Sequence, residues 1–492
     1  MFNRPSSQPA LASPRDPRDI RPSRNATPKC HPSGRLTLTT LSLAFFMVIL
    51  DTTIVNVALP TIERSLGATV TGLQWVVDGF TLVFAALLLS AGALGDRWGS
   101  RRVFIWGLMI FTAGSGLAAG SPVITWLVGA RLVQGLGAAM VLPASLALIA
   151  VGFPDPQHRA RALGVWAAVA GIATALGPVV GGLLIAVAGW RAIFLVNLPI
   201  GVLGLLLARR SLTETPRHAR PIDLPGQITA TVGLVLVTLA LVNAGSDGWA
   251  SPQVIGTGLL GLGFGALFLV VERRTRVPIL PAPLFARPTF SAANLVGGIL
   301  NFGIYGQVFV LSLYFQHQRG LSALTTGLAL LPFASMTMIG PVFVGRLVAR
   351  VGPWRPMVLG QLLMAVGTIA LALSHAETPY ADLIGGLVAL GVGMALTMPS
   401  MTAAAVQAAP VQYAGVASGM LNTARQIGGA LGVAVLGSFL ADSARFMRGL
   451  HLGLALVAAV FLAGTWVAAR YGAMPSAARE AVARGDSLEE NR

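Results

Sequence analysis

The sequence carries little charge and almost no cysteine. Only 11% of its 492 residues are Asp, Glu, Lys or Arg, against about a quarter in a typical soluble domain. A single cysteine excludes a disulfide framework, a CxxC metal site and an iron–sulfur cluster. The six histidines are scattered and none belongs to an HExxH motif. The sequence therefore predicts neither a metal site nor a cofactor.

Apolar residues are correspondingly abundant. They make up 54% of the chain, which leaves too little polar surface to cover soluble domains of this size. Apolar runs long enough to cross about 30 Å of hydrocarbon as helices recur from residue 36 onward. Fourteen spans are expected, at 36–59, 73–94, 103–120, 123–149, 162–188, 192–208, 226–244, 254–271, 290–315, 324–345, 356–374, 383–407, 416–440 and 450–470. The fold class is thus an all-α, multi-pass membrane protein.

The two ends of the chain lie outside these spans. Residues 1–35 are rich in Pro, Ser and Arg and are expected to be disordered. The first apolar run starts too late and is too long for a secretory signal. Residues 471–492 form a second polar tail. An even number of spans places both tails on one side.

The basic residues identify that side. With the N-terminus in the cytoplasm, 27 of the 34 Lys and Arg residues lie in cytoplasmic segments, five in external loops and two in spans. This is the positive-inside pattern. The net charge of +16 is therefore an orientation signal in the inner (cytoplasmic) membrane. The expected partner is the lipid bilayer, and nucleic-acid binding is not expected.

Two segments of the chain repeat one pattern. GALGDRWGSRR begins at Gly92 and GRLVARVGPWR begins at Gly345, and without gaps Gly99 matches Gly352. Both copies follow an even-numbered span, which two homologous six-helix halves would explain. Duplicated helical halves around a central site are the layout of secondary transporters.

Eight spans, not six, separate the two copies, so a helix pair has been inserted. We expect bundles at 36–210 and 290–470 and a linker, 211–289, that carries the pair 226–244 and 254–271. The pair has no charge within its spans. We therefore expect it to be peripheral, with its polar groups in loops.

Six motifs occur in order along the spans. They are LDTTIVNVALP (50–60), GALGDRWGSRR (92–102), RLVQGLGAA (131–139), ATALGPVVGG (173–182), WRAIFLVNLPIG (190–201) and ASGMLNTARQIGGALG (417–432). Over residues 36–470 the chain resembles the major facilitator superfamily, and more narrowly the fourteen-helix drug/proton antiporters of the EmrB/QacA type. The resemblance implies a monomeric transporter, not an enzyme, that exchanges protons for drugs or other small amphipathic compounds. A proton-coupled uptake symporter of the same fold is the alternative.

Asp51 and Arg131 are the candidates for proton coupling. Asp51 is the only carboxylate deep within a predicted span, where a charge costs about 2.5–3.5 kcal/mol. Arg131 lies at a similar depth, about 12 Å into the fourth span, so the two pair if their helices face each other. Gln134 follows Arg131 on the same helix face. The alternatives are a permanent structural ion pair and, for Arg131, a bridge to backbone carbonyls.

Four further polar residues are candidates for a substrate or cavity site, together with Gln134. Asp78 lies near the outer end of the second span, where it either reaches the interface or belongs to an outer proton or substrate path. Arg425 lies in the thirteenth span between Asn422 and Gln426, and no acid in the later spans neutralises it. It either faces a water-filled cavity, binds an anionic group of a substrate, or simply snorkels or bonds carbonyls.

The loop motif after the second span combines glycines with clustered charges. Two of its glycines permit close helix approach and a tight turn. Asp96 lies at a helix C-terminus, where the dipole disfavours an anion. The resemblance implies a latch in which Asp96 pairs with a neighbouring Arg and the helix N-terminus near Gly415, only in the outward-open state; an ordinary interfacial charge cluster is the alternative. The latch set is Gly92, Asp96, Arg97, Gly99, Arg101 and Arg102.

The fifth span carries the motif that the resemblance associates with antiport. Pro178 removes a helix hydrogen bond. Gly177, Gly181 and Gly182 are expected to let this helix pack closely against its partner in the other half. Ala173 stands where the motif usually begins with Gly. Generic packing of small residues, without a role in antiport, is the alternative.

Overall fold

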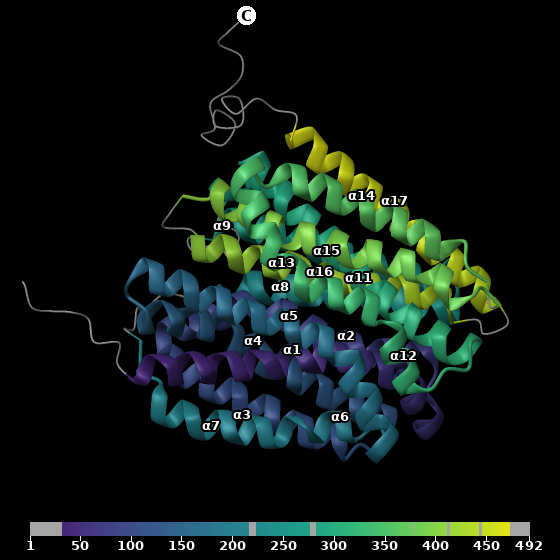
Figure 1. Cartoon of the computed structure of the whole chain (residues 1–492), viewed down its shortest axis with the longest axis horizontal. Coiled ribbons are helices and arrows are strands. Elements are labelled where there is room, and N and C mark those ends of the chain that lie inside the picture. Colours follow the sequence, from purple (N-terminus) through teal and green to yellow (C-terminus); the bar gives the residue numbers. More distant parts are fainter. Residues whose placement is uncertain are drawn as a thin grey trace, which may run out of the picture.

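The computed structural model describes residues 32–215, 223–275, 282–375, 377–410, 414–441 and 445–472, and all regular elements in these ranges are helices. The predicted tails, 1–35 and 471–492, lie outside the described residues except at 32–35 and 471–472. Residues 32–35 begin α1, so the expectation of disorder was wrong for them, and residues 471–472 end α17. In Figure 1 the helices run side by side, with the N-terminal ones in the lower part of the view and the C-terminal ones in the upper part. We call the end where α1 begins and α17 stops the terminal end, and the opposite end the distal end.

The N-terminal group consists of α1–α7. α4 packs against α2 and α3, while α1 packs against α5 and α7. The bounds are α1 Pro32–Leu66, α2 Val70–Trp98, α3 Ser100–Ala119, α4 Ile124–Gly152, α5 Pro156–Ala188, α6 Ala192–Leu195 and α7 Asn197–Ser211. Local sequence explains where the helices begin: at α5, Asp155 accepts the N–H of His158 and Pro156 occupies the first turn, where a missing N–H costs nothing.

The C-terminal group consists of α10–α17. α11 packs against α16 and α17, and α15 packs against α13 and α14. The bounds are α10 Ala282–Phe285, α11 Pro288–Leu313, the π-helical turn η2 Tyr314–Gln318, α12 Ala323–Ala329, α13 Leu331–Val351, α14 Trp354–Ala372, α15 Tyr380–Ala408, α16 Ala414–Phe439 and α17 Phe446–Gly472.

Twelve helices of the described ranges are long and apolar enough to cross a membrane, or thirteen if the bent pair α12–α13 counts as one span. The predicted span 324–345 is this pair. It bends by 47° at Leu330, because Pro332 lacks the N–H that a continuous helix would need. The predicted span 416–440 corresponds to α16, which is not among the twelve and carries Asn422, Arg425 and Gln426 near its middle. The expected count of fourteen therefore exceeds what apolar length alone supports.

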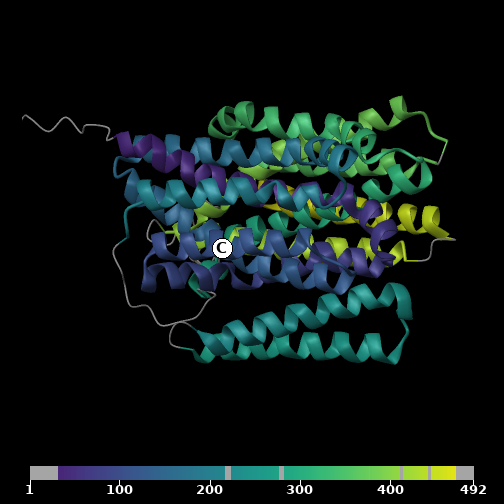
Figure 2. The same cartoon turned by 90° about the horizontal axis from the view of Figure 1, so that it is seen from below.

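The inserted pair, α8 (Leu224–Asp247) and α9 (Pro252–Arg274), forms a hairpin along one side of the molecule (Figure 2). α9 leaves most of its surface exposed, as a lipid-facing helix does. α8 instead packs against both α2 and α16. Gln227 of α8 donates to the carbonyl of Ala86 at 2.5 Å and accepts a hydrogen bond from Ser90, both on α2. The expectation that the pair keeps its polar groups in loops was wrong.

The two groups of helices meet closely at the distal end. α5 packs against α12 and α13, and α2 packs against α16. Gln316 of η2 donates to the carbonyl of Val57 on α1 at 3.0 Å. His317 Nε2 lies 2.9 Å from Glu63 Oε2 of α1. These contacts tie the groups together where α1 ends.

The repeated motif adopts one backbone conformation in its two copies. Gly99 follows the last residue of α2 with φ of 95°, and Gly352 follows α13 with φ of 78°. Glycine favours this region because it has no Cβ. At Gly99 a Cβ would also overlap the carboxylate of Glu214. The two aligned glycines thus terminate corresponding helices in the same way.

Candidate functional site

A buried polar network surrounds Asp51 in the middle of the N-terminal group. Asp51 on α1 is 0% exposed and Arg131 on α4 is 1% exposed, and the two form an ion pair. Gln134 Nε2 donates to Asp51 Oδ1 at 3.1 Å, and Asn197 Nδ2 of α7 donates to the same oxygen at 2.8 Å. Ser115 of α3 accepts from Gln134 at 2.8 Å. The pairing expected from equal depth is present, and four helices contribute to it.

Arg131 is held in place on several sides. Its Nε donates to the carbonyl of Val76 on α2 at 2.9 Å, and its Nη1 donates to Gln134 Oε1 at 2.9 Å. The guanidinium carbon lies 4.5 Å from the ring centroid of Phe80, a cation–π distance. The arginine is therefore paired, hydrogen-bonded and packed, as a charge in an apolar interior must be.

Sequence reasoning missed Asn197 and Ser115. Asn197 belongs to the motif WRAIFLVNLPIG and is the polar side chain in an apolar stretch, which was the available signal. No signal in the sequence pointed to Ser115, because a serine in a membrane helix commonly donates to a carbonyl of its own helix, as Ser115 does to the carbonyl of Phe111.

Asp78 lies in a different environment on α2. Its side chain is 0% exposed, and neither carboxylate oxygen has a hydrogen-bond partner. One turn earlier, Gln74 donates to the carbonyl of Ala434 on α16 at 2.8 Å. Asp78 therefore lies on the α2 face that α16 covers. The interpretation that Asp78 simply reaches the membrane interface was wrong, because the C-terminal group seals this face.

Arg425 lies on α16 and faces α11. Its Nε lies 3.4 Å from Asn301 Oδ1, and its Nη1 lies 3.2 Å from Asn422 Oδ1. Asn422 also donates to the carbonyl of Ser418. Gln426, the next residue, has a buried Oε1 without a partner. The structure thus separates the candidates into an N-terminal cluster around Asp51, the isolated Asp78, and the Arg425 cluster.

The loop motif contacts the segment that follows α7. Arg101 N–H donates to Glu214 Oε1 at 3.0 Å, and Arg102 Nε lies 3.8 Å from Glu214 Oε2. Asp96 is half-buried and Arg97 is exposed, while Gly92 faces Pro143 of α4. The expected latch partner is the helix N-terminus near Gly415, which is the start of α16. Residues 411–413, directly before it, lie outside the described part of the chain. The latch stays a prediction.

The glycines of α5 divide between two neighbours. A Cβ at Gly177 would overlap Thr53 of α1, and one at Gly181 would lie 2.7 Å from Ile54 Cγ1. Gly182 meets Leu324 of α12, where a Cβ would lie 2.5 Å from the Cα. The carbonyl of Pro178 contacts Gly327, which also belongs to α12. Gly182 therefore faces the other half as expected, and the carbonyl of Pro178 does so too, whereas Gly177 and Gly181 were wrongly assigned and pack within their own group.

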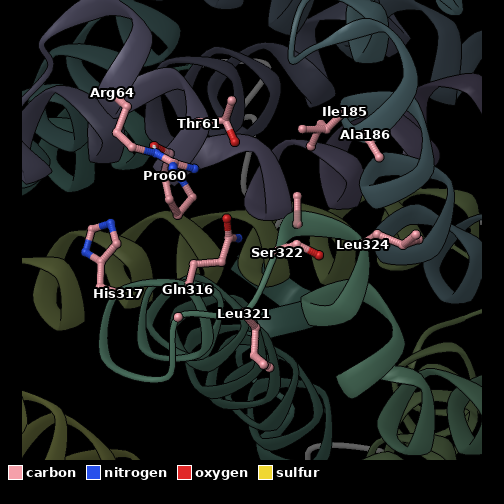
Figure 3. Close-up of a pocket in the computed structure, with 12 residues that line it drawn as sticks. Pro60, Thr61, Arg64, Ile185, Ala186, Gln316, His317, Leu321, Ser322 and Leu324 are labelled. Atoms are coloured by element: carbon pink, nitrogen blue, oxygen red, sulfur yellow. Dashed lines mark hydrogen bonds between the residues drawn. The ribbon is translucent and has the colours of Figure 1, made fainter.

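A cavity of about 550 Å³ lies at the distal end between the two groups. Figure 3 shows Arg64 of α1 and His317 of η2 on facing walls, with Gln316 beside them. Arg64 donates to the carbonyl of Pro60 at 3.2 Å. In the described ranges, no three His, Cys, Asp or Glu side chains come together to hold a metal ion.

The sequence matches known transporters over most of its length. The Major Facilitator Superfamily profile matches residues 41–433. The chain is 37% identical over 444 residues to the methylenomycin A resistance protein of Streptomyces coelicolor, covering 90% of this chain and 93% of that one. It is 39% identical over 410 residues to the multidrug resistance protein Stp of Mycobacterium tuberculosis, covering 82% and 76%. It is 33% identical over 408 residues to the tetracenomycin C resistance and export protein of Streptomyces glaucescens, covering 82% and 76%.

Solved structures share the fold at low sequence identity. A POT family transporter in complex with 5-aminolevulinic acid has a TM-score of 0.66 and 14% identity, covering 88% of this chain and 96% of that one. A bacterial homologue of the human lysosomal transporter Spinster, in an inward-facing and occupied conformation, has a TM-score of 0.63 and 16% identity, covering 88% and 96%. The helical arrangement is therefore that of this transporter fold.

Proposed function

Because the chain belongs to the major facilitator superfamily and is related over most of its length to antibiotic-resistance proteins, we propose that it exports drugs or other small amphipathic compounds across the cytoplasmic membrane in exchange for protons. The relationship to the methylenomycin A resistance protein, over 90% of this chain, carries the proposal of export. The buried Asp51–Arg131 network supports coupling to protons.

We further propose fourteen spans, with the terminal end in the cytoplasm, and a monomeric transporter. α16 would be a span despite its polar residues, because its length of 26 residues suffices and α11 packs along it. The bent pair α12–α13 would be another. The positive-inside distribution supports this orientation.

In this mechanism, Asp51 is the residue that responds to protons. Ionised, it is attracted to Arg131 and accepts hydrogen bonds from Gln134 and Asn197. Protonation would remove the ionic attraction and turn one oxygen into a donor, so the cluster would have to rearrange. Asn197 belongs to α7 and Arg131 to α4, so the rearrangement would shift helices relative to α1.

Asp78 is proposed to be a second proton site, which is protonated in this conformation. A buried carboxylate without hydrogen-bond donors or a cation is far more stable neutral than charged, and both oxygens of Asp78 are in that situation. The covering helix, α16, belongs to the C-terminal group. Separation of α2 from α16 would therefore admit water to Asp78 and let it exchange protons with the external side.

The contacts between the groups indicate which side is closed. The ties of Gln316 to Val57 and of His317 to Glu63 lie at the distal end. With that end external, this conformation would exclude the outside and receive substrate from the cytoplasm. The predicted latch of the loop motif would form after the groups rock to the opposite state.

Transport into inside-out membrane vesicles that contain the protein would test this function. Antiport predicts that compounds accumulate in vesicles with an acidic lumen and that their addition dissipates the proton gradient. Accumulation confined to right-side-out vesicles, driven by an acidic exterior, would support the uptake symporter instead.

A further inference from the structure

Arg425 is a cation in the middle of a membrane helix without a carboxylate beside it. It lies eleven residues after the start of α16, about 17 Å along the helix axis. The described part of residues 288–472 contains two acidic residues. Glu377 lies in the connection before α15 and Asp382 lies in its first turn, both at the distal end. The two hydrogen-bond partners of Arg425 are neutral amide oxygens. Its charge is therefore not neutralised within the described C-terminal group.

A second unused donor lies next to the guanidinium. Asn301 Oδ1 accepts from Arg425 Nε, and Asn301 Nδ2 has no partner although the residue is 1% exposed. A buried donor left unpaired is costly. Arg425 offers five N–H groups, of which two are used. Arg425 and Asn301 therefore leave more donors without a partner than the one unpaired amide acceptor of the cluster, Gln426 Oε1, could receive, which is the reverse of a cation site.

Apolar and aromatic groups border these donors. Tyr305 follows Asn301 by one turn of α11 and packs beside Gly429, one turn after Arg425. At Gly297, one turn before Asn301, a Cβ would lie 3.3 Å from Arg425 Cγ and 3.4 Å from the sulfur of Met401. A thioether near the aliphatic stem of Arg425 and a ring one turn further along the helices suit a ligand with an apolar body and an anionic end.

The N-terminal group offers no comparable site. Arg131 is already neutralised by Asp51 and enclosed by aromatic rings. We propose that Arg425, with Asn301, binds the carboxylate of an amphipathic organic acid, and that the exported compounds include such acids. This inference rests on the proposed function and names the substrate class of its C-terminal site. Weak acids enter cells in neutral form and ionise in the cytoplasm, so the carboxylate is the form that an exporter meets there.

The test compares 1-pyrenebutyrate with its methyl ester, which share the apolar body and differ in the charge. Binding to the purified full-length protein in lipid nanodiscs is followed by pyrene fluorescence. We expect the wild type to bind the acid at least about tenfold more tightly than the ester, since charge-assisted hydrogen bonds are worth that factor. Arg425→Gln should abolish this preference and leave the affinity for the ester within about twofold of the wild-type value. Arg346→Gln, at an exposed arginine of α13, is the matched control and should keep it.

Each other outcome counts against the inference. Equal binding of acid and ester by the wild type removes the carboxylate site. Loss of both ligands in Arg425→Gln, in a protein that stays monodisperse, assigns Arg425 to the packing of α11 on α16 instead. Failure of the proposed function would look different: the acid preference would be present in nanodiscs, but no compound would accumulate in inside-out vesicles under a proton gradient.

Discussion

Removing the charge of Asp51 should destabilise the folded protein and also stop proton coupling. Asp51→Asn keeps the size of the side chain but leaves Arg131 buried without its anion. It also replaces one carboxylate oxygen with an NH₂ group. At the Oδ2 position this donor would face the donor of Arg131, and at the Oδ1 position it could not accept the hydrogen bonds of Gln134 and Asn197. Breaking a buried ion pair by removing one partner costs about 3–5 kcal/mol. We therefore expect a clearly lowered thermal midpoint.

A double-mutant cycle separates the two effects of this change. Arg131→Met alone should be destabilising to a similar degree, because it leaves Asp51 as the unpaired charge. The double variant should be more stable than the sum of the single changes predicts, since no buried charge remains. Proton-driven accumulation should be lost in all three variants, because none retains both a titrating carboxylate and its cation.

Thermal unfolding in detergent and uptake into proteoliposomes provide the two readouts. Asp155→Asn is the control, because it makes the same chemical change at an exposed helix N-cap, where Asn caps as well as Asp does. Additive effects in the double variant would refute the ion-pair reasoning. Full proton-driven accumulation by Asp51→Asn would refute the coupling role.

Three further changes test other parts of the structure. Gly99→Ala should strain the loop motif by about 1–2 kcal/mol and also displace Glu214, slowing transport more than Gly352→Ala, which has positive φ but no close neighbour; equal transport rates in the two variants would contradict this. Gln227→Leu should lower the thermal midpoint by detaching α8 from α2, and an unchanged midpoint would show that the hydrogen bond is dispensable. Asp78→Asn should leave the thermal midpoint nearly unchanged, because a neutral amide replaces a neutral acid, but it should reduce the proton exchange measured with a pH dye; a large loss of stability would mean that Asp78 is ionised.

The inserted hairpin illustrates how packing changes an interpretation. Its spans carry no charge, and that composition predicts a lipid-facing appendage. α9 has this character, but α8 lies against one helix from each group. Its start is bonded to α2 through Gln227, and near its end Gly245 contacts Ser438 of α16. A helix that touches both groups is placed to influence their movement, so substitutions along α8 are expected to affect transport.

Composition and spacing alone determined the class of the protein. Scarce charge, long apolar runs and the uneven distribution of arginine predict an all-α membrane protein, and the ordered motifs predict its family. The equal depths of Asp51 and Arg131 also predict their pairing. These inferences succeed because the rise per residue and the periodicity of the side chains are properties of a single helix. The depth of a residue along its helix and the helix face on which it lies therefore follow from its position in the sequence.

The tertiary structure decided which helix faces meet. It placed Asn197 and Ser115 beside Asp51, covered Asp78 with α16, and left Arg425 next to amides instead of an acid. Each outcome depends on the packing of helices that are distant in the chain, and no periodicity within one helix specifies its neighbour. The environment of a buried charge, and hence what it can bind or release, is for that reason a property of the assembled bundle.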